Sequence, residues 1–564
     1  MKQLTVAEKQ WVKEYVGKMT LSEKISQTIC EHVTHILEDE EFMHITDVKE
    51  KIQTYIDKYN VGNIFISGEI IKGPTGDGKE TKEIIELLQK NAKIPMLVAG
   101  DIEFGVGSVV RNQTSFPSNM TLATIDDLNV AYNVGRCVGM EAKAIGFNWC
   151  FGPVVDLYND WMAGGSSRNI SDEPDTVIKV ANEIIRGMND ENLVATAKHF
   201  PGITGDLNSH LTASGCECSE EEWYNTYGKI YEELTKNHVE SIMIAHVYLK
   251  WAEEFNEEEN GYCPATLSRK AVQGILRDKI GFDGVAVTDA VNMSAFVLWK
   301  NYKQRMIDLI NSGQDVALWP GKEYEDVITD AVKRGEIKEE TLDKCVERIL
   351  SLKIKCGILD ITKSDLKGEQ KAYDMEAITK EAEELNKMVC KNSVTCVRNL
   401  DKQLPLDSDK VKNVLVLKLE RIGSPYSPCN RFISKLKERG CVIDEYCPDD
   451  FNDWTKKVQM IKDEKAGKRW DAYFILYNHS SIGNHRPVGD FALSLWRTSA
   501  IETVKPILIS FDTPFLLYDL PHIKTFITTF GSGSKTIVEQ LVRDIFGEDE
   551  FNYKVPVKFI EPKR

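Results

Sequence analysis

Seven short apolar runs recur between residues 61 and 321, and each ends near a polar or glycine residue. They read VGNIFISG, IPMLVAGD, FNWCFGPVVD, LVATAKH, SIMIAHV, GVAVTDA and QDVALWPG. Runs this apolar suit strands that are buried on both faces, as in parallel sheets. Longer amphipathic segments such as SRKAVQGILRDKIG lie between them and predict helices. The alternation predicts an α/β fold that closes as a TIM-type (β/α)8 barrel, with an open doubly wound sheet as the alternative.

A second, smaller unit is predicted after the barrel. The polar, aperiodic stretch ITKSDLKGEQKAYD indicates a linker. Further apolar runs follow it, namely NVLVLKL, DAYFILYN, KPILISF and TFITTF, and they alternate with helical patterns. We therefore predict a barrel over residues 1–360, a linker over 361–374 and an αβα sandwich over 375–564.

Composition limits the partners of this chain. The net charge of −17 argues against nucleic acid and against an anionic membrane surface, because both bind clustered Lys and Arg. A neutral small-molecule or oligosaccharide substrate fits this charge. No run of 18 apolar residues exists, so we predict no membrane span. The N-terminal stretch lacks the pattern of a secretory signal, and a cytoplasmic protein is expected. The sequence does not indicate an oligomeric state.

Cysteine and histidine spacing predicts no metal site. The 13 cysteines show no disulfide framework, and reduced thiols are expected. Cys216 and Cys218 form a CEC motif that has no second pair nearby. His32 and His35 of HVTH are expected on the polar face of a helix. We predict neither a metal nor an organic cofactor.

Titratable residues follow several of the predicted strands. They are Asp101, Asp156, Lys198, His199, His246 and Asp289. One such residue is weak evidence, since aspartates at strand ends also cap helices. In a parallel barrel, however, all carboxyl ends of the strands meet on one face. The convergence of these groups therefore predicts an active site there.

The stretch AKHFPGITGDLNSHL supplies a second chemical group. Pro201 and Gly202 turn the chain, so the following residues form a loop able to fold over the barrel mouth. His210 in that loop can give and take a proton near neutral pH, because histidine has an ordinary pKa of about 6.5. Asp289 is either a helix N-cap or a nucleophile or base. A carboxylate nucleophile with a proton donor on the opposite side is what acetal cleavage requires.

These residues also carry a resemblance to glycoside hydrolase family 3. The matching stretches are MTLSEKISQ, GFNWCFGPVVD, SRNISDEPDTV, AKHFPG followed by SH, IMIAHV, PATLSRKAVQGILRDKIGFDGVAVTDAVNM, AVKRGEIKEETLDKCVERILSLKIKCGIL and NSVTCVRNLDKQLPL. They span nearly the whole chain. The resemblance implies a catalytic barrel with Asp289 as its nucleophile. It also implies that Asp101, Arg168, Lys198 and His199 hold the hydroxyls of the non-reducing sugar.

The KHFPG motif with a downstream histidine resembles the β-N-acetylglucosaminidase branch of that family. There the loop histidine is the general acid/base, and an aspartate two residues earlier pairs with it. Here Asn208 stands at that position, so His210 should be a weaker base. Asp206 is the alternative partner if the loop curls back. We predict that His210 is the acid/base and that His246 is a further substrate-binding residue.

The predicted activity is that of a retaining exo-β-glycosidase acting on non-reducing terminal β-N-acetylglucosaminides. A β-glucosidase or β-xylosidase of the same family is the nearest alternative. A phosphorylase is another, because a neutral histidine does not repel phosphate as a carboxylate would. Asn208 also motivates an alternative of a different class, a sugar-binding protein without catalysis.

Overall fold

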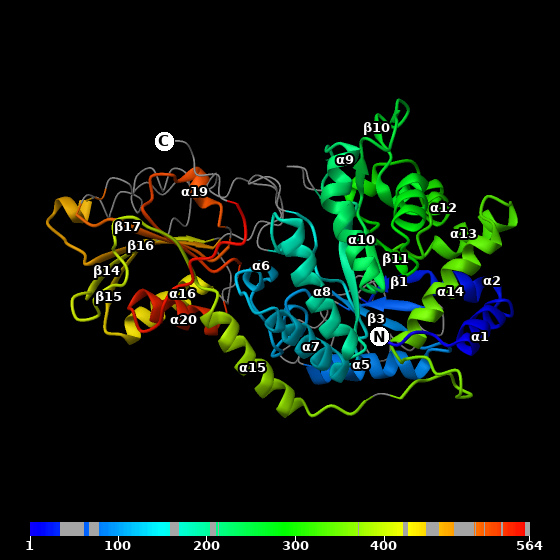
Figure 1. Ribbon diagram of the computed structural model, residues 1–564, viewed down its shortest axis with the longest axis horizontal. Helices are drawn as coiled ribbons and strands as arrows, with labels where there is room; N and C mark the ends of the chain where they lie inside the picture. Colours follow the sequence, from blue (N-terminus) through cyan, green and yellow to red (C-terminus); the bar gives the residue numbers. More distant parts are fainter. Residues whose placement is uncertain are drawn as a thin grey trace. The chain divides into compact units, whose positions relative to one another are not determined.

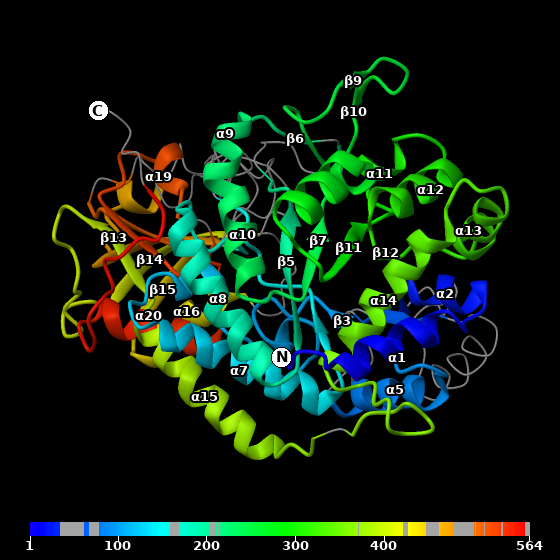
Figure 2. The same ribbon diagram turned by 45° about the vertical axis from the view of Figure 1, so that its right-hand side comes forward.

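The first unit of the computed structural model contains a closed barrel of eight parallel strands (Figures 1 and 2). The structure describes residues 1–33, 61–66, 78–157, 168–203, 210–212, 214–369, 371–420, 427–446, 462–478, 501, 503–512, 514–531 and 534–558. In order around the barrel the strands are β1 (Ile29–His32), β12 (Val316–Leu318), β11 (Val285–Ala290), β7 (Ser241–Ile244), β5 (Val194–Phe200), β4 (Trp149–Cys150), β3 (Leu97–Gly100) and β2 (Asn63–Phe65). The predicted TIM-type barrel is confirmed, and the open-sheet alternative is wrong.

Each of the seven predicted runs contains one barrel strand, but the eighth strand, β1, was not predicted. Its sequence, ICEH, is short and ends in two polar residues, so it lacks the apolar signal of the others. The expectation that His32 lies on a helix is therefore wrong. His32 ends β1, and its ring lies 5.4 Å from that of Phe65 and 4.9 Å from that of Trp319, between centroids. His35 lies outside the described residues.

Alternate side chains of the strands fill the barrel. Leu97, Trp149, Val194, Val285 and Val316 belong to one buried cluster, as the two-residue period of strands requires. The indole Nε1–H of the fully buried Trp149 donates to the Thr196 hydroxyl at 2.8 Å. The polar end of this large side chain is thus satisfied inside the core.

Helices surround the strand ring, as Figures 1 and 2 show. In the first unit they are α1 (Val6–Val16), α2 (Leu21–Gln27), α5 (Gly78–Asn91), α7 (Leu128–Ile145), α8 (Pro174–Asp190), α9 (Glu220–Trp223), α10 (Lys229–Lys236), α11 (Ser294–Val297), α12 (Tyr302–Ser312), α13 (Tyr324–Lys333), α14 (Glu339–Lys355) and the π-helical segments Tyr224–Gly228 and Lys270–Lys279. Thr20 and Glu23 form a capping box at the start of α2, which the sequence MTLSEK predicts.

The second unit is built on a six-stranded sheet. Its strands, in order across the sheet, are β13 (Thr395–Asn399), β18 (Thr525–Thr528), β17 (Pro506–Ser510), β16 (Ala472–Asn478), β14 (Asn413–Glu420) and β15 (Val442–Tyr446). Only the β13–β18 pair is antiparallel among these neighbours. Its helices are α6 (Asn119–Leu122), α16 (Pro428–Glu438), α19 (Leu516–Asp519) and α20 (Lys535–Ile545), and α15 (Met375–Lys391) spans the boundary between the units.

Both faces of this sheet are buried. Val414 and Phe474 pack on one face with Phe432 of α16 and Leu541 of α20. Tyr473 on the other face belongs to a separate cluster with α19. The predicted sandwich is thus confirmed. The first unit comprises Met1–Ser115, Leu128–Leu157 and Glu173–Glu383, and the second comprises Phe116–Asp127, Tyr158–Asp172 and Glu384–Arg564. The limits of the domains and of the linker given above stay a prediction.

Within the described part of the chain, we find no helix with the length and apolar character needed to cross a bilayer.

One buried lysine makes the stability of the first unit depend on pH. Lys353 of α14 has no exposed surface, and its ammonium donates to Gln27 Oε1 at 2.6 Å and to the Gly62 carbonyl at 3.0 Å. Burial lowers the pKa of Lys353 to about 7. In the unfolded chain a lysine has a pKa of about 10.4. Between these values the unfolded state binds more protons, so the free energy of unfolding must rise with pH.

We expect the Lys353→Met variant to lose this pH dependence. The unfolding free energy of the wild type minus that of the variant should rise between pH 7 and 10 by up to about 1.4 kcal/mol per pH unit. Urea denaturation at several pH values measures it. Lys344→Met, at an exposed position of the same helix, is the control and should keep the wild-type slope. A pH-independent difference for Lys353→Met would contradict the account.

Candidate active site

Lys198 lies near the carboxyl end of β5 and joins two carboxylates. Its ammonium Nζ is 2.8 Å from Asp101 Oδ1 and 2.6 Å from Glu103 Oε1. The side chains of Lys198 and Glu103 are 3% and 7% exposed, whereas that of Asp101 is 50% exposed. A buried lysine between two carboxylates is held in one position. The exposed Asp101 carboxylate is the part of this group that an incoming hydroxyl can reach.

His199, the next residue, is fixed by Asp156. Its Nδ1 lies 2.6 Å from Asp156 Oδ2, and the carboxylate also accepts the Ile203 N–H at 3.0 Å. A carboxylate acceptor at this distance requires the proton on Nδ1. Asp156 therefore orients the ring and directs Nε2 away from itself. The same carboxylate therefore fixes both the His199 ring and the backbone at Ile203.

Asp289 lies at the end of β11 and is partly exposed. Helix α11 starts five residues later with Met293 as its N-cap, so Asp289 is not a helix cap. The Ala290 N–H donates to Asp289 Oδ1 at 2.8 Å. Burial by itself raises the pKa of Asp289, but His199, His246, the Ala290 N–H and Lys198 outweigh it and the net pKa is lowered. The carboxylate is therefore ionised at neutral pH and has the nucleophilic form.

His246 is wholly buried beside Asp289. Its Nε2 lies 2.9 Å from the Ala290 carbonyl, and its Nδ1 lies 2.7 Å from the Thr266 hydroxyl. A carbonyl only accepts, so Nε2 carries a proton. Burial lowers the pKa of His246, against the attraction of Asp289. Both ring nitrogens are thus engaged by protein groups, and the ring fixes the backbone that follows Asp289.

The loop histidine is tied to the segment after Asp289. His210 is exposed, and its carbonyl accepts the Ser294 N–H at 3.1 Å. It also acts electrostatically on His246. Asp206 and Asn208 lie outside the described residues. Arg168 belongs to a short segment that groups with the second unit, and its predicted role in sugar binding stays a prediction.

The structure gives roles to residues for which the sequence analysis proposed none. Glu103 follows Asp101 by two positions in AGDIEFG, and this spacing was its only signal. Asp156 was expected at a strand end but without a role. Thr266 lies 20 positions after His246, in the 3-10 turn Ala265–Leu267, and nothing in the sequence links the two.

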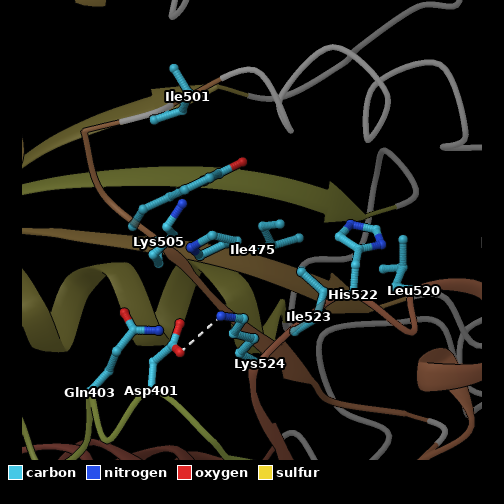
Figure 3. A pocket seen from close by; sticks show the side chains of 11 residues that line it. Asp401, Gln403, Ile475, Ile501, Lys505, Leu520, His522, Ile523 and Lys524 are labelled. Carbon is cyan, nitrogen blue, oxygen red and sulfur yellow. Dashed lines mark hydrogen bonds and ion pairs between the residues drawn. The ribbon is translucent and has the colours of Figure 1, made fainter. Parts of the chain in front are cut away.

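The described residues include no candidate metal site, and a separate pocket lies in the second unit. Among the described residues, no group of three or more His, Cys, Asp or Glu side chains is arranged to hold a metal ion. The second unit has a pocket of about 190 Å³ at the amino ends of β16 and β17 (Figure 3). Lys524 binds Asp401 at 3.1 Å on its wall, and His522 and Lys505 also line it. None of the predicted catalytic residues lines this pocket.

The barrel and its mouth define a class of enzyme. Buried acids, a lysine and oriented histidines at the carboxyl ends of parallel strands make a site for acid–base and nucleophilic chemistry on a polar substrate. The model of the glycosyl hydrolase family 3 N-terminal domain matches residues 20–352, which is more than half of the chain. The chain therefore belongs to glycoside hydrolase family 3.

Related proteins cover the full length of the chain. A β-N-acetylglucosaminidase/β-glucosidase of Cellulomonas fimi is 26% identical over 566 residues, which cover 97% of this chain and 95% of that protein. The structure of a β-glucoside phosphorylase bound to 2FGlc superposes with a TM-score of 0.81 at 25% identity, covering 98% of this chain and 97% of that one. A β-N-acetylglucosaminidase from Paenibacillus sp. shares the fold, with a TM-score of 0.78 at 22% identity and coverage of 97% and 100%.

These similarities make the chain a glycoside hydrolase and do not favour a sugar-binding protein without catalysis. They do not select one sugar, because hexosaminidases, glucosidases and a xylosidase all occur among the relatives.

Proposed function

We propose that the protein is a retaining exo-β-glycosidase that removes non-reducing terminal β-N-acetylglucosamine by double displacement. The observation that supports this most is the state of Asp289, an ionised and partly exposed carboxylate at the barrel mouth. The Ala290 N–H engages Oδ1, and this leaves Oδ2 for attack on the anomeric carbon. The product of that attack is a covalent glycosyl-enzyme.

His210 is the proposed acid/base. It protonates the departing glycosidic oxygen in the first step, and the resulting neutral imidazole takes a proton from water in the second. The hydrogen bond between the His210 carbonyl and Ser294 supports this role, because it ties the loop to the chain segment that follows Asp289. Asn208 or Asp206 is proposed as the side chain that pairs with His210 and orients its ring.

The remaining groups are proposed to hold the sugar and the nucleophile. Asp101 accepts hydrogen bonds from sugar hydroxyls, and Lys198 and His199 make further hydrogen bonds to them. Because these groups hold the sugar in one position, less entropy is lost on the way to the transition state. Arg168 is proposed to join them. His246 is proposed to act as a positioning residue through the Ala290 carbonyl, in place of the substrate contact predicted from the sequence. We further propose that the enzyme works in the cytoplasm.

A panel of aryl glycosides tests the choice of sugar. We expect kcat/KM for 4-nitrophenyl β-N-acetylglucosaminide to exceed that for the glucoside and the xyloside by about tenfold or more, the scale of discrimination by one specific pocket contact. A preference for the glucoside or the xyloside in steady-state kinetics would replace the proposed substrate by that sugar. A released sugar that is first the α-anomer in NMR spectra would contradict retention.

Phosphorolysis is the second candidate, because the solved structure of a β-glucoside phosphorylase is similar over nearly the whole chain. In that reaction phosphate takes the place of water in attacking the glycosyl-enzyme. The same panel, run with and without inorganic phosphate, separates the two. Sugar 1-phosphate as the main product would establish phosphorolysis, and free sugar in the presence of phosphate would establish hydrolysis.

A further inference from the structure

Two cysteines lie in contact on the segment that follows His210. Cys216 ends the short strand β6 (Ser214–Cys216), and Cys218 comes two residues later. Alternate residues of an extended chain face the same side, so both thiols point the same way. Their Sγ atoms are 2.9 Å apart, with one thiol hydrogen-bonded to the other. A disulfide bond is about 2.05 Å long, so closing the pair requires a movement of less than about 1 Å.

The two thiols differ in exposure and in acidity. Cys216 has no exposed surface, whereas Cys218 is partly exposed. Ten of the twelve described cysteines are buried, and Cys263 is the other partly exposed one. The hydrogen bond from Cys216 lowers the pKa of Cys218, whereas burial raises that of Cys263 to about 12. Since the thiolate is the reactive form, Cys218 has the properties of an attacking thiol and Cys263 does not.

The strand that carries Cys216 is coupled to the proposed active site. Strand β6 pairs with β8 (Val247–Leu249), where Cys216 lies opposite Leu249 and Ser214 opposite Val247. Val247 directly follows His246, and Ser214 comes four residues after His210. Gly215 lies against Tyr248 so closely that a Cβ atom there would be 2.2 Å from the ring. Because no space remains between Gly215 and the Tyr248 ring, we expect a movement of β6 to displace β8 as well.

We propose that Cys216 and Cys218 form a reversible dithiol–disulfide site whose oxidation changes the activity of the barrel. The effect on activity rests on the roles proposed for His210 and His246. The site responds to low-molecular-weight disulfides, a redox-sensing use that transient disulfides have in reducing compartments, and this part rests on the cytoplasmic location proposed above.

The oxidation proceeds by two exchanges. The Cys218 thiolate attacks one sulfur of a disulfide RSSR, forming a mixed disulfide and releasing RS⁻. The Cys216 sulfur attacks Sγ of Cys218, and its proton passes to the departing RS⁻ beside it, because Cys216 has no exposed surface. The Cys216–Cys218 bond forms, the mixed disulfide breaks and the second RS⁻ leaves. Two electrons pass from the protein to RSSR, and the two released thiolates take up the two protons.

The full-length protein treated with oxidised glutathione tests the site. We expect intact mass to fall by two hydrogens without a glutathione adduct, and peptide mapping to place the bond between Cys216 and Cys218. Cys218→Ser should prevent both changes. Cys216→Ser should stop at a glutathione adduct on Cys218. Cys263→Ser, the matched control at the other partly exposed thiol, should still form the bond.

Activity on the best-cleaved aryl glycoside tests the coupling. We expect kcat/KM of the oxidised wild type to change at least about threefold, to recover with dithiothreitol and to stay constant in Cys218→Ser. Absence of the internal disulfide, or a disulfide that leaves kcat/KM unchanged, would overturn the proposal. The intact-mass and peptide-mapping measurements need no substrate, so their results remain valid even if the proposed sugar or acid/base is wrong.

Discussion

Asp289→Ala is expected to lower kcat at least about a thousandfold on every β-glycoside that the enzyme cleaves. Without the carboxylate no glycosyl-enzyme can form at this position. Lys198 is an ammonium group held by two carboxylates, and His246 is wholly buried with both nitrogens engaged. The fold should persist, since Asp289 is partly exposed near the end of β11 and caps no helix. Steady-state kinetics and circular dichroism measure the two effects.

The matched control is Asp283→Ala, six residues earlier, at a carboxylate whose side chain is 92% exposed. This variant should keep wild-type rates. A 5-fluoro glycosyl fluoride should label the wild type with one glycosyl group on the peptide that contains Asp289, and the label should be absent from Asp289→Ala. Label on another residue, or wild-type turnover in Asp289→Ala, would remove Asp289 from the mechanism.

His210→Ala is expected to lower kcat by about 10²- to 10⁴-fold on substrates with alkyl leaving groups. These leaving groups depart only with a proton. The loss should be much smaller for the formation of the intermediate from a 2,4-dinitrophenyl glycoside, because that phenolate leaves unprotonated. Intermediate then accumulates, since no base activates water. Stopped-flow kinetics should therefore show a burst for the variant with this substrate.

The control for His210 is His522→Ala, an exposed histidine of the second unit. It should leave the leaving-group dependence unchanged. A His210→Ala variant that loses the same factor for alkyl and dinitrophenyl substrates would show that the histidine holds the sugar and does not transfer the proton.

The sequence predicted the barrel because most of its strands are buried on both faces and therefore read as apolar runs. It failed for β1, where Glu31 and His32 break the run. Glu31 is nonetheless 4% exposed, and its carboxylate accepts the His32 N–H. A buried strand can carry polar residues when local hydrogen bonds satisfy them, and such a strand does not form an apolar run in the sequence. In the second unit β13 (TCVRN) and β15 (VIDEY) were missed for a different reason: both lie at sheet edges, where partly exposed polar residues interrupt the apolar pattern.

The candidate site was predicted to the extent that its residues lie at strand ends. Lys198, His199, His246 and Asp289 end or follow predicted strands, and the structure brings them together. Hydrogen-bond partners were harder to predict. Thr266 meets His246 from a turn 20 positions away, and only folding brings the two together. Glu103 was overlooked because its partner, Lys198, lies 95 positions later in the chain, and the sequence shows neither that pairing nor the burial of Glu103.

The chain of contacts from Thr266 through His246 to the Ala290 carbonyl separates two tasks within one mouth. This chain of contacts is internal and does not include Asp101, so we expect mutations at Asp101 to act on the proposed sugar contacts more than on the backbone next to Asp289, the proposed nucleophile. On the proposed roles, substitutions at Asp101, and not at the buried residues Thr266 and His246, are the ones to use for changing the glycoside that the enzyme prefers.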